Sequence, residues 1–259
     1  MKLFPLDCGV MKFPRSSILP GGETQKDAWL SVHIAAFLIE TPEGLLLFDT
    51  GCDPAGMLGS WPADYRRIPF QESYLPAQLD ALGVKPEDIR YVIASHLHFD
   101  HAGCLHLFRN ARIFVSRAEL DTTLHAYENG LDLNAHLPSD IENWRRADLA
   151  WEPISSETTE HRLAPGVTIV NLGPGHAWGL LGLMVNLPAG GSHFLVSDAI
   201  YTGTHLGPPP IVPALVHDEE GYRRTISFIE AYASRHHATV VYGHDAEQFR
   251  SLRAKGCIE

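Results

Sequence analysis

Three histidines and one aspartate fall within six residues of this 259-residue chain, in the stretch SHLHFDHAG from Ser95 to Gly103. On an extended segment, side chains two residues apart point the same way, so His96 and His98 can hold one metal ion. Asp100 and His101 are adjacent, just past a bend, and can turn toward a second ion. Imidazole and carboxylate together suit Zn²⁺, Fe²⁺, Mn²⁺ or Co²⁺. The spacing therefore favours a metal site over a solvated polar loop.

Further candidate ligands follow apolar stretches elsewhere in the chain. VTIVNLGPG leads into His176, SHFLVS into Asp198 and TVVYG into His244, as YVIAS leads into His96. LLLF likewise leads into Asp49. Such residues at the ends of strands indicate one site built at a common edge of the fold. One more histidine could complete each metal site, and the carboxylate after SHFLVS could bridge the two ions.

The apolar stretches predict the strands that position these residues. Residues 33–40 and 44–51 are expected to form a β-hairpin across the turn TPEG. Six further strands are expected at 91–96, 111–116, 167–173, 181–188, 192–200 and 238–245. The order is β-rich, then α, then β-rich, then α, which suggests two sheets packed together with helices outside.

Helices are predicted by periodicity and by their end signals. Residues 76–84 and 219–236 are expected to be helical, the second with an apolar face. Another helix is expected to begin with a capping box formed by Ser116 and Glu119. Residues 127–159 carry weaker periodicity, so irregular helices and loops are expected there.

Composition narrows the class of protein. The length suits one domain over residues 1–259, and the formal net charge of -11 argues against nucleic acid as the main partner. No apolar run approaches a membrane span, and the N-terminus has no signal-peptide core. The four cysteines are scattered without a CxxC pair, which predicts reduced thiols in a cytoplasmic protein. Either a monomer or a homodimer is expected.

HLHFDH, followed by GPGH, SD and YGHD, resembles the dinuclear metallo-β-lactamase superfamily over essentially the full chain, from FDTG to YGHDAEQF. Within it, SHLHFDHAG, DAIY and GHDAEQ look like the N-acyl homoserine lactonases, the quorum-quenching enzymes. The resemblance implies an α/β fold, an αββα sandwich of two mixed β-sheets flanked by helices. It also implies two divalent transition-metal ions per chain, with zinc expected in preference to iron, manganese or cobalt. The implied ligands are His96, His98 and His176 for one ion, Asp100, His101 and His244 for the other, and Asp198 as the bridge.

The activity that the resemblance implies is that of a metal-dependent lactonase, a carboxylic ester hydrolase. A metal-bridging hydroxide would open the ring of an N-acyl homoserine lactone, a small substrate with an apolar acyl chain. Tyr201 matches a tyrosine placed over the substrate carbonyl, Asp100 would pass the proton to the leaving ring oxygen, and Asp49 would orient a ligand histidine. Four apolar features could be plain core or walls of an acyl pocket: Trp29, Phe99, Trp178 and the loop LGPPPIV.

Other branches of the superfamily fit less well. The common zinc β-lactamases would have cysteine at Asp198, and a flavo-diiron protein would have glutamate at His98. A lactonase for another lactone, similar to 4-pyridoxolactonase, and a glyoxalase II-type thioesterase stay open as alternatives. The family pattern TPGH, followed by a second GH, is altered here at Gly173 and Leu180, which affects the substrate loop and no ligand.

Overall fold

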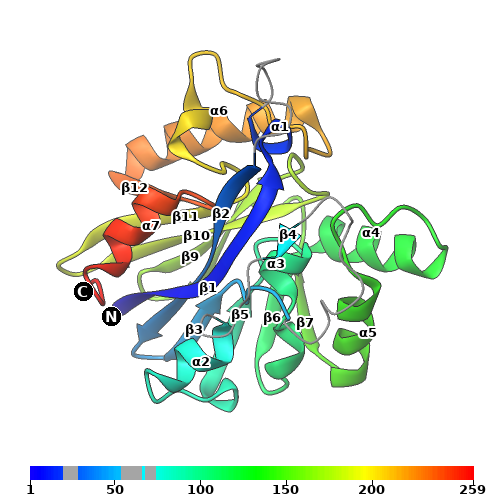
Figure 1. Cartoon of the computed structure of the whole chain (residues 1–259). Coiled ribbons are helices and arrows are strands. Elements are labelled where there is room, and N and C mark those ends of the chain that lie inside the picture. Colours follow the sequence, from blue (N-terminus) through cyan, green and yellow to red (C-terminus); the bar gives the residue numbers. More distant parts are fainter. Residues whose placement is uncertain (20–28, 54–65, 68–73) are drawn as a thin grey trace.

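The structure is a computed structural model that describes residues 1–19, 29–53, 66–67 and 74–259 (Figure 1). Two β-sheets pack face to face, and helices cover both outer faces. The expected αββα sandwich of two mixed sheets is therefore confirmed. Among the described residues, no helix is both long enough and apolar enough to span a bilayer.

The first sheet has seven strands in the order β4-β1-β2-β3-β5-β6-β7. Their bounds are β1 (Lys2–Pro14), β2 (Trp29–Thr41), β3 (Gly44–Phe48), β4 (Arg66–Arg67), β5 (Ile89–Ile93), β6 (Arg112–Ser116) and β7 (Ala150–Ile154). The predicted hairpin is β2–β3, which pairs Thr41 with Gly44. The neighbouring strands β3, β5, β6 and β7 pair in parallel, so the loops that leave β3 and β5 emerge at the same edge.

The second sheet has five strands in the order β12-β11-β10-β9-β8. Their bounds are β8 (Glu160–Ala164), β9 (Val167–Gly173), β10 (Leu180–Leu187), β11 (Gly191–Ser197) and β12 (Ala238–Tyr242). β11 and β12 pair in parallel and the other neighbours are antiparallel. Asp198 directly follows β11 and His244 lies two residues past β12, so the parallel pairing brings these two residues to one edge.

Apolar side chains fill the space between the sheets and under both helical layers. The central layer joins Ile39, Leu46 and Ile93 of the first sheet to residues of the second, among them Leu183 and Leu195. The first sheet is covered by α2 (Leu75–Asp80), α3 (Phe99–Ala102), α4 (Arg117–Glu128) and α5 (Pro138–Ala147). The second sheet is covered by α6 (Glu219–His236). The remaining short elements are α1 (Arg15–Ile18), α7 (Ala246–Arg253), η2 (Pro86–Asp88), η3 (Leu105–Leu107) and η4 (Gly203–Leu206).

Two local predictions are wrong. Ser116 is the N-cap residue of α4, but its side chain makes no capping hydrogen bond, and the Glu119 carboxylate accepts hydrogen bonds from other loops instead. Residues 127–159 contain the regular helix α5 and the strand β7, rather than only irregular structure. Four strands that were not predicted, β1, β4, β7 and β8, carry proline or charged residues that break the period of two, and pairing with a neighbour decides their conformation.

Candidate metal centre

The loop that leaves β5 carries the first four candidate ligands. His96 lies in the loop itself, His98 is the N-cap residue of α3, and Asp100 and His101 lie in the helix. All four are at most 5% exposed. The bend expected before Asp100 is therefore the start of a short helix, which turns this carboxylate and the following imidazole away from the direction of the extended segment.

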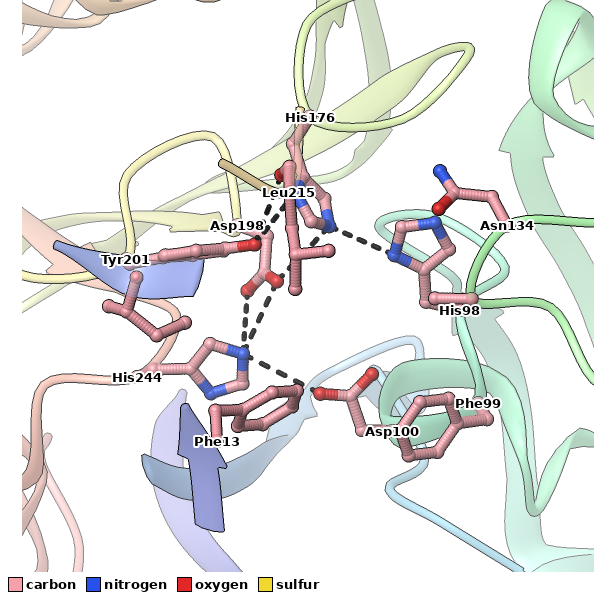
Figure 2. Close-up of a pocket in the computed structure, with 12 residues that line it drawn as sticks. Phe13, His98, Phe99, Asp100, Asn134, His176, Asp198, Tyr201, Leu215 and His244 are labelled. Atoms are coloured by element: carbon pink, nitrogen blue, oxygen red, sulfur yellow. Dashed lines mark hydrogen bonds and ion pairs between the residues drawn. The ribbon is translucent and has the colours of Figure 1, made fainter. Parts of the chain in front are cut away.

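The fold brings all seven predicted ligands together. Figure 2 shows His98, Asp100, His176, Asp198 and His244 pointing toward one another. Their ligand atoms form three overlapping groups, each with all atoms within 4.8 Å of one another. The groups are His96, His98 and His176; His96, His101 and Asp198; and Asp100, His101 and His244. In the first group, His98 Nδ1 lies 2.9 Å from His176 Nε2. Such a cluster can hold more than one ion.

The Asp198 carboxylate lies between the two ends of the cluster. Its Oδ2 atom is 3.3 Å from His176 Nε2 and 3.2 Å from His244 Nε2, and its Oδ1 atom is 3.1 Å from His244 Nε2 and 3.4 Å from His101 Nε2. Asp100 Oδ2 lies 3.5 Å from both His101 Nε2 and His244 Nε2. Asp198 therefore faces both ends of the cluster, whereas Asp100 faces only the end formed by His101 and His244.

The donor atoms fit divalent metal ions. His96 Nε2 and His101 Nε2 are buried and form no hydrogen bond with any residue that the structure describes. Buried polar atoms in proteins are normally hydrogen-bonded, and groups without a partner call for an ion or another polar group. Imidazole nitrogens with carboxylate oxygens are the donor set of zinc and of similar transition metals.

The electrostatics divide the cluster into two halves. Burial lowers the pKa of His96 and of His98 well below the usual imidazole range, and nearby imidazoles lower it further. Both rings are therefore neutral, as a metal ligand must be. Burial opposes charge on His101 and His244 too, but the adjacent carboxylates, including Asp198, outweigh it and raise the pKa of both rings. The carboxylates of this second half therefore favour a positive charge there, either on an imidazole ring or on a bound cation.

Oxygen acceptors orient three of the imidazoles from behind. The pairs are His101 Nδ1 with Asp49 Oδ2 (2.9 Å), His176 Nδ1 with the Leu215 carbonyl (2.9 Å) and His244 Nδ1 with the His33 carbonyl (2.7 Å). Such contacts select the ring nitrogen that is left for a metal. The expected position of Asp49 behind a ligand histidine is thus found. Sequence reasoning missed the two carbonyls, because a backbone oxygen carries no residue-type signal.

Tyr201 lies three residues after Asp198, with 2% of its surface exposed. Its hydroxyl group is 3.0 Å from His176 Nδ1 and 3.4 Å from the Leu215 carbonyl, to which it donates. The phenol ring packs edge-on against His176 and His244, with centroids 5.2 and 5.5 Å away. The hydroxyl therefore reaches the edge of the cluster, in agreement with its offset from Asp198.

A pocket opens onto the cluster. Its polar end is formed by His98, Asp100, His176, Asp198, Tyr201 and His244, and its apolar walls by Phe13, Ile18, Phe99, Ala135 and Leu215 (Figure 2). Of the apolar features expected as candidates, Phe99 lines this pocket. Trp178 lies behind the cluster, stacked on His136 with ring centroids 4.6 Å apart. The site thus combines a polar metal-binding end with an apolar chamber.

Comparisons with known proteins agree with this geometry. The family model of the Metallo-beta-lactamase superfamily matches residues 31–244. N-acyl homoserine lactonase AiiB of Agrobacterium fabrum is 38% identical over 264 residues, which cover 97% of this chain and 96% of that protein.

Two solved structures share the fold over nearly the whole chain. A Bacillus thuringiensis AiiA mutant with N-decanoyl-L-homoserine bound at the active site matches with a TM-score of 0.81 and 27% identity, covering 96% of this chain and 95% of that one. An N-acyl homoserine lactone hydrolase with the product N-hexanoyl-L-homoserine bound at the catalytic metal center gives the same TM-score, identity and coverage. The chain therefore belongs to the metallo-β-lactamase superfamily and, within it, to the N-acyl homoserine lactonases, a family of lactone-hydrolysing enzymes.

Proposed function

We propose that this chain opens the lactone ring of N-acyl homoserine lactones at a dinuclear metal centre. The observation that carries the proposal is the position of Asp198 between His176 on one side and His101 and His244 on the other, at the polar end of an apolar pocket. A carboxylate in this position can bridge two ions. The chamber beside it suits a substrate with one polar ring and one apolar chain.

The proposed ligand assignment follows the distances. His96, His98 and His176 would hold one ion, Asp100, His101 and His244 would hold the other, and Asp198, which lies between these groups, would serve both. Zinc is the proposed metal, because neutral imidazole and carboxylate donors suit it. Two such ions supply an activated water and polarise the lactone carbonyl.

Two side chains at the polar end of the pocket have proposed roles in proton transfer and charge stabilisation. Tyr201 donates a hydrogen bond to the carbonyl oxygen as negative charge develops on it. Its hydroxyl group now contacts His176 Nδ1 at 3.0 Å and donates a long bond of 3.4 Å to the Leu215 carbonyl. Asp100 lines the same pocket and carries a proton to the ring oxygen as the ester bond breaks.

The apolar walls account for binding of the acyl chain. Phe13, Ile18, Phe99 and Leu215 offer aromatic and aliphatic surface beside the polar end. Each methylene buried there contributes about 0.8 kcal/mol, so affinity should rise with chain length until the pocket is full. The solved relatives that hold hexanoyl and decanoyl homoserine products support a substrate of this shape.

Two arginines of the C-terminal region already have partners, which argues against the thioesterase alternative. A glutathione thioester would need a cationic site there, but Arg224 pairs with Asp218 and Glu220. Arg253 likewise lies 2.9 Å from Gln78 Oε1 and 3.8 Å from Asp7. These cations already have partners, so they are poorly suited to binding an anionic thiol tripeptide.

A substrate panel with metal analysis on the same sample tests the proposal. Acyl homoserine lactones with short and long chains, other lactones, glutathione thioesters and phosphodiesters are offered to the purified protein. We expect two metal ions per chain and turnover of acyl homoserine lactones, lost on chelation and restored by Zn²⁺. Turnover of thioesters or phosphodiesters without any lactone would overturn the assignment. Full activity with at most one ion per chain would overturn the dinuclear centre.

A further inference from the structure

One carboxylate behind the metal cluster is absent from the ligand set. Glu119, near the start of α4, is completely buried. Its Oε1 atom accepts a hydrogen bond from the Leu97 backbone N–H at 2.9 Å and lies 2.8 Å from His136 Nε2. Its Oε2 atom accepts from the Gly179 backbone N–H at 3.1 Å. Burying a carboxylate is costly unless it is hydrogen-bonded, and here both oxygens are.

These contacts join two ligand loops that are far apart in the sequence. Leu97 lies between His96 and His98, and Gly179 lies three residues after His176. The same carboxylate therefore holds the backbone between His96 and His98 and the loop that follows His176. Glu119 does not line the pocket, so it acts through these loops and does not touch the substrate.

The loop that contains Gly179 can approach α4 only because this residue has no side chain. A Cβ atom there would lie 2.2 Å from Ser116 Oγ and 3.4 Å from the Glu119 backbone nitrogen. The approach brings the Gly179 N–H within reach of the carboxylate. The absent capping box has the same cause, because the Glu119 side chain turns toward this loop instead of toward the helix N-terminus.

His136 connects Glu119 to His98, because its ring contacts both residues. Besides its contact with Glu119, the ring has Nδ1 2.7 Å from the Leu133 carbonyl, so hydrogen bonds fix both nitrogens. The ring packs edge-on against His98, with centroids 4.7 Å apart, and stacks on Trp178. His98 Nε2 has no hydrogen-bond partner among the described residues, so ring packing is what holds this side of His98.

We propose that Glu119 is a positioning residue for the His96, His98 and His176 metal group, acting through two backbone N–H groups and through His136. The inference rests on the metal assignment of the proposed function. Asp49 orients His101 by a direct hydrogen bond and reaches His96 through the Ser95 hydroxyl, which lies 3.0 Å from His96 Nδ1. Glu119 acts on the same metal group as His96 through the loops and through ring packing on His98.

Replacing Glu119 by glutamine, Glu119→Gln, tests this role with little change in shape. An amide has one acceptor oxygen, so its NH₂ group must face either the Gly179 N–H or the Leu97 N–H with His136, and at least one tether is lost. Metal-free protein is titrated with Co²⁺, and binding is followed by visible absorption. Removing outer contacts of this kind typically weakens metal binding by about 10- to 100-fold. We expect a loss in this range for one of the two ions.

A matched control separates positioning from folding. Thr123 is buried one turn further along α4, and its hydroxyl donates to the Glu119 carbonyl at 2.7 Å without reaching either loop. Thr123→Val should lower thermal stability and leave both Co²⁺ affinities unchanged. In a His98→Ala background, which removes the affected group, Glu119→Gln should weaken the remaining ion no further. His136→Gln, which keeps an N–H donor and loses the ring, should weaken the same ion.

The outcomes distinguish this inference from the proposed function. Wild-type Co²⁺ affinities in Glu119→Gln and His136→Gln would overturn the positioning role. An equal loss of Co²⁺ affinity at both sites in Glu119→Gln, with the same loss in Thr123→Val, would overturn it as well. That result would make Glu119 a residue that stabilises the fold only. A wild-type protein that binds two ions and opens no lactone would overturn the proposed function alone.

Discussion

Asp49→Asn should weaken metal binding in the half of the centre that contains His101 and leave the fold intact. Asp49 is 2% exposed, and its Oδ2 atom lies 2.9 Å from His101 Nδ1. The Ser95 and Ser197 hydroxyls donate to the same oxygen, while Oδ1 accepts from the Ser95 backbone N–H at 2.7 Å. The carboxylate is thus fully used as an acceptor.

Asparagine fits this position without backbone strain. Asp49 has a φ of 59°, in the left-handed region that asparagine tolerates well, and the two side chains have nearly the same shape. The amide, however, has one acceptor oxygen. If it keeps the Ser95 N–H, its NH₂ group faces His101 Nδ1. The ring must then place its proton on Nε2, the nitrogen needed for the metal.

The expected loss follows from the cost of removing such an orienting contact. Metal affinity should fall by about 10- to 100-fold, which corresponds to about 1.4 to 2.7 kcal/mol of binding free energy. Lactone turnover at limiting Zn²⁺ should fall with occupancy. Excess Zn²⁺ should restore part of the turnover, because the ligand is misoriented and not deleted.

Zn²⁺ titration of metal-free protein against a competing chelator measures the effect. Asp148→Asn is the matched control, since Asp148 also has a positive φ, 53°, but is exposed at the end of α5. The control should bind Zn²⁺ like the wild type. Unchanged Zn²⁺ affinity and turnover in Asp49→Asn would refute the orienting role and leave Asp49 as a turn former.

Three further predictions concern the pocket, the core and the thiols. Tyr201→Phe should lower kcat by about 10- to 100-fold at unchanged metal content, because one oxyanion donor is lost while the metals share the charge; kinetics with wild-type kcat would make Tyr201 a packing residue. Asp140→Asn should flatten the pH dependence of unfolding. Burial and the nearby Asp53 carboxylate raise the pKa of Asp140 from 3.8 to about 8, so the folded wild type keeps a proton that the unfolded chain releases. The wild type should therefore lose up to about 1.4 kcal/mol per pH unit between about pH 4 and pH 8 relative to the variant, and parallel urea-unfolding curves would contradict this. A thiol reagent should modify one cysteine per chain rapidly, because Cys257 is only half-buried, whereas Cys8, Cys52 and Cys104 are buried and burial raises the pKa of their thiols. Four fast thiols would show that these three are not buried.

The metal cluster could be predicted from the sequence because its information is local. The run from His96 to His101 sets residue types and spacing within one loop, and each later ligand follows a recognisable apolar stretch. The hairpin β2–β3 and the helix α6 were equally accessible, since alternation and helical periodicity are properties of short windows.

Other elements depended on their neighbours. β7 contains a proline and a glutamate and is a strand because it pairs in parallel with β6. β1 is interrupted at Asp7, where a register shift against β2 absorbs the irregular residues. The pattern at Ser116 and Glu119 matches a capping box. The Glu119 carboxylate instead accepts a hydrogen bond from the Gly179 N–H, in a loop of the second sheet.

The sequence by itself therefore determined which residues can bind metal and which family the chain resembles. Only the tertiary structure decided how those residues are held. The carbonyl that orients His244 belongs to His33, 211 residues earlier, and any residue type could supply it. Glu119 lies 60 residues from Gly179, and its part in the centre depends on two loops meeting at the start of α4. Such contacts arise from packing between distant segments, so no local spacing encodes them.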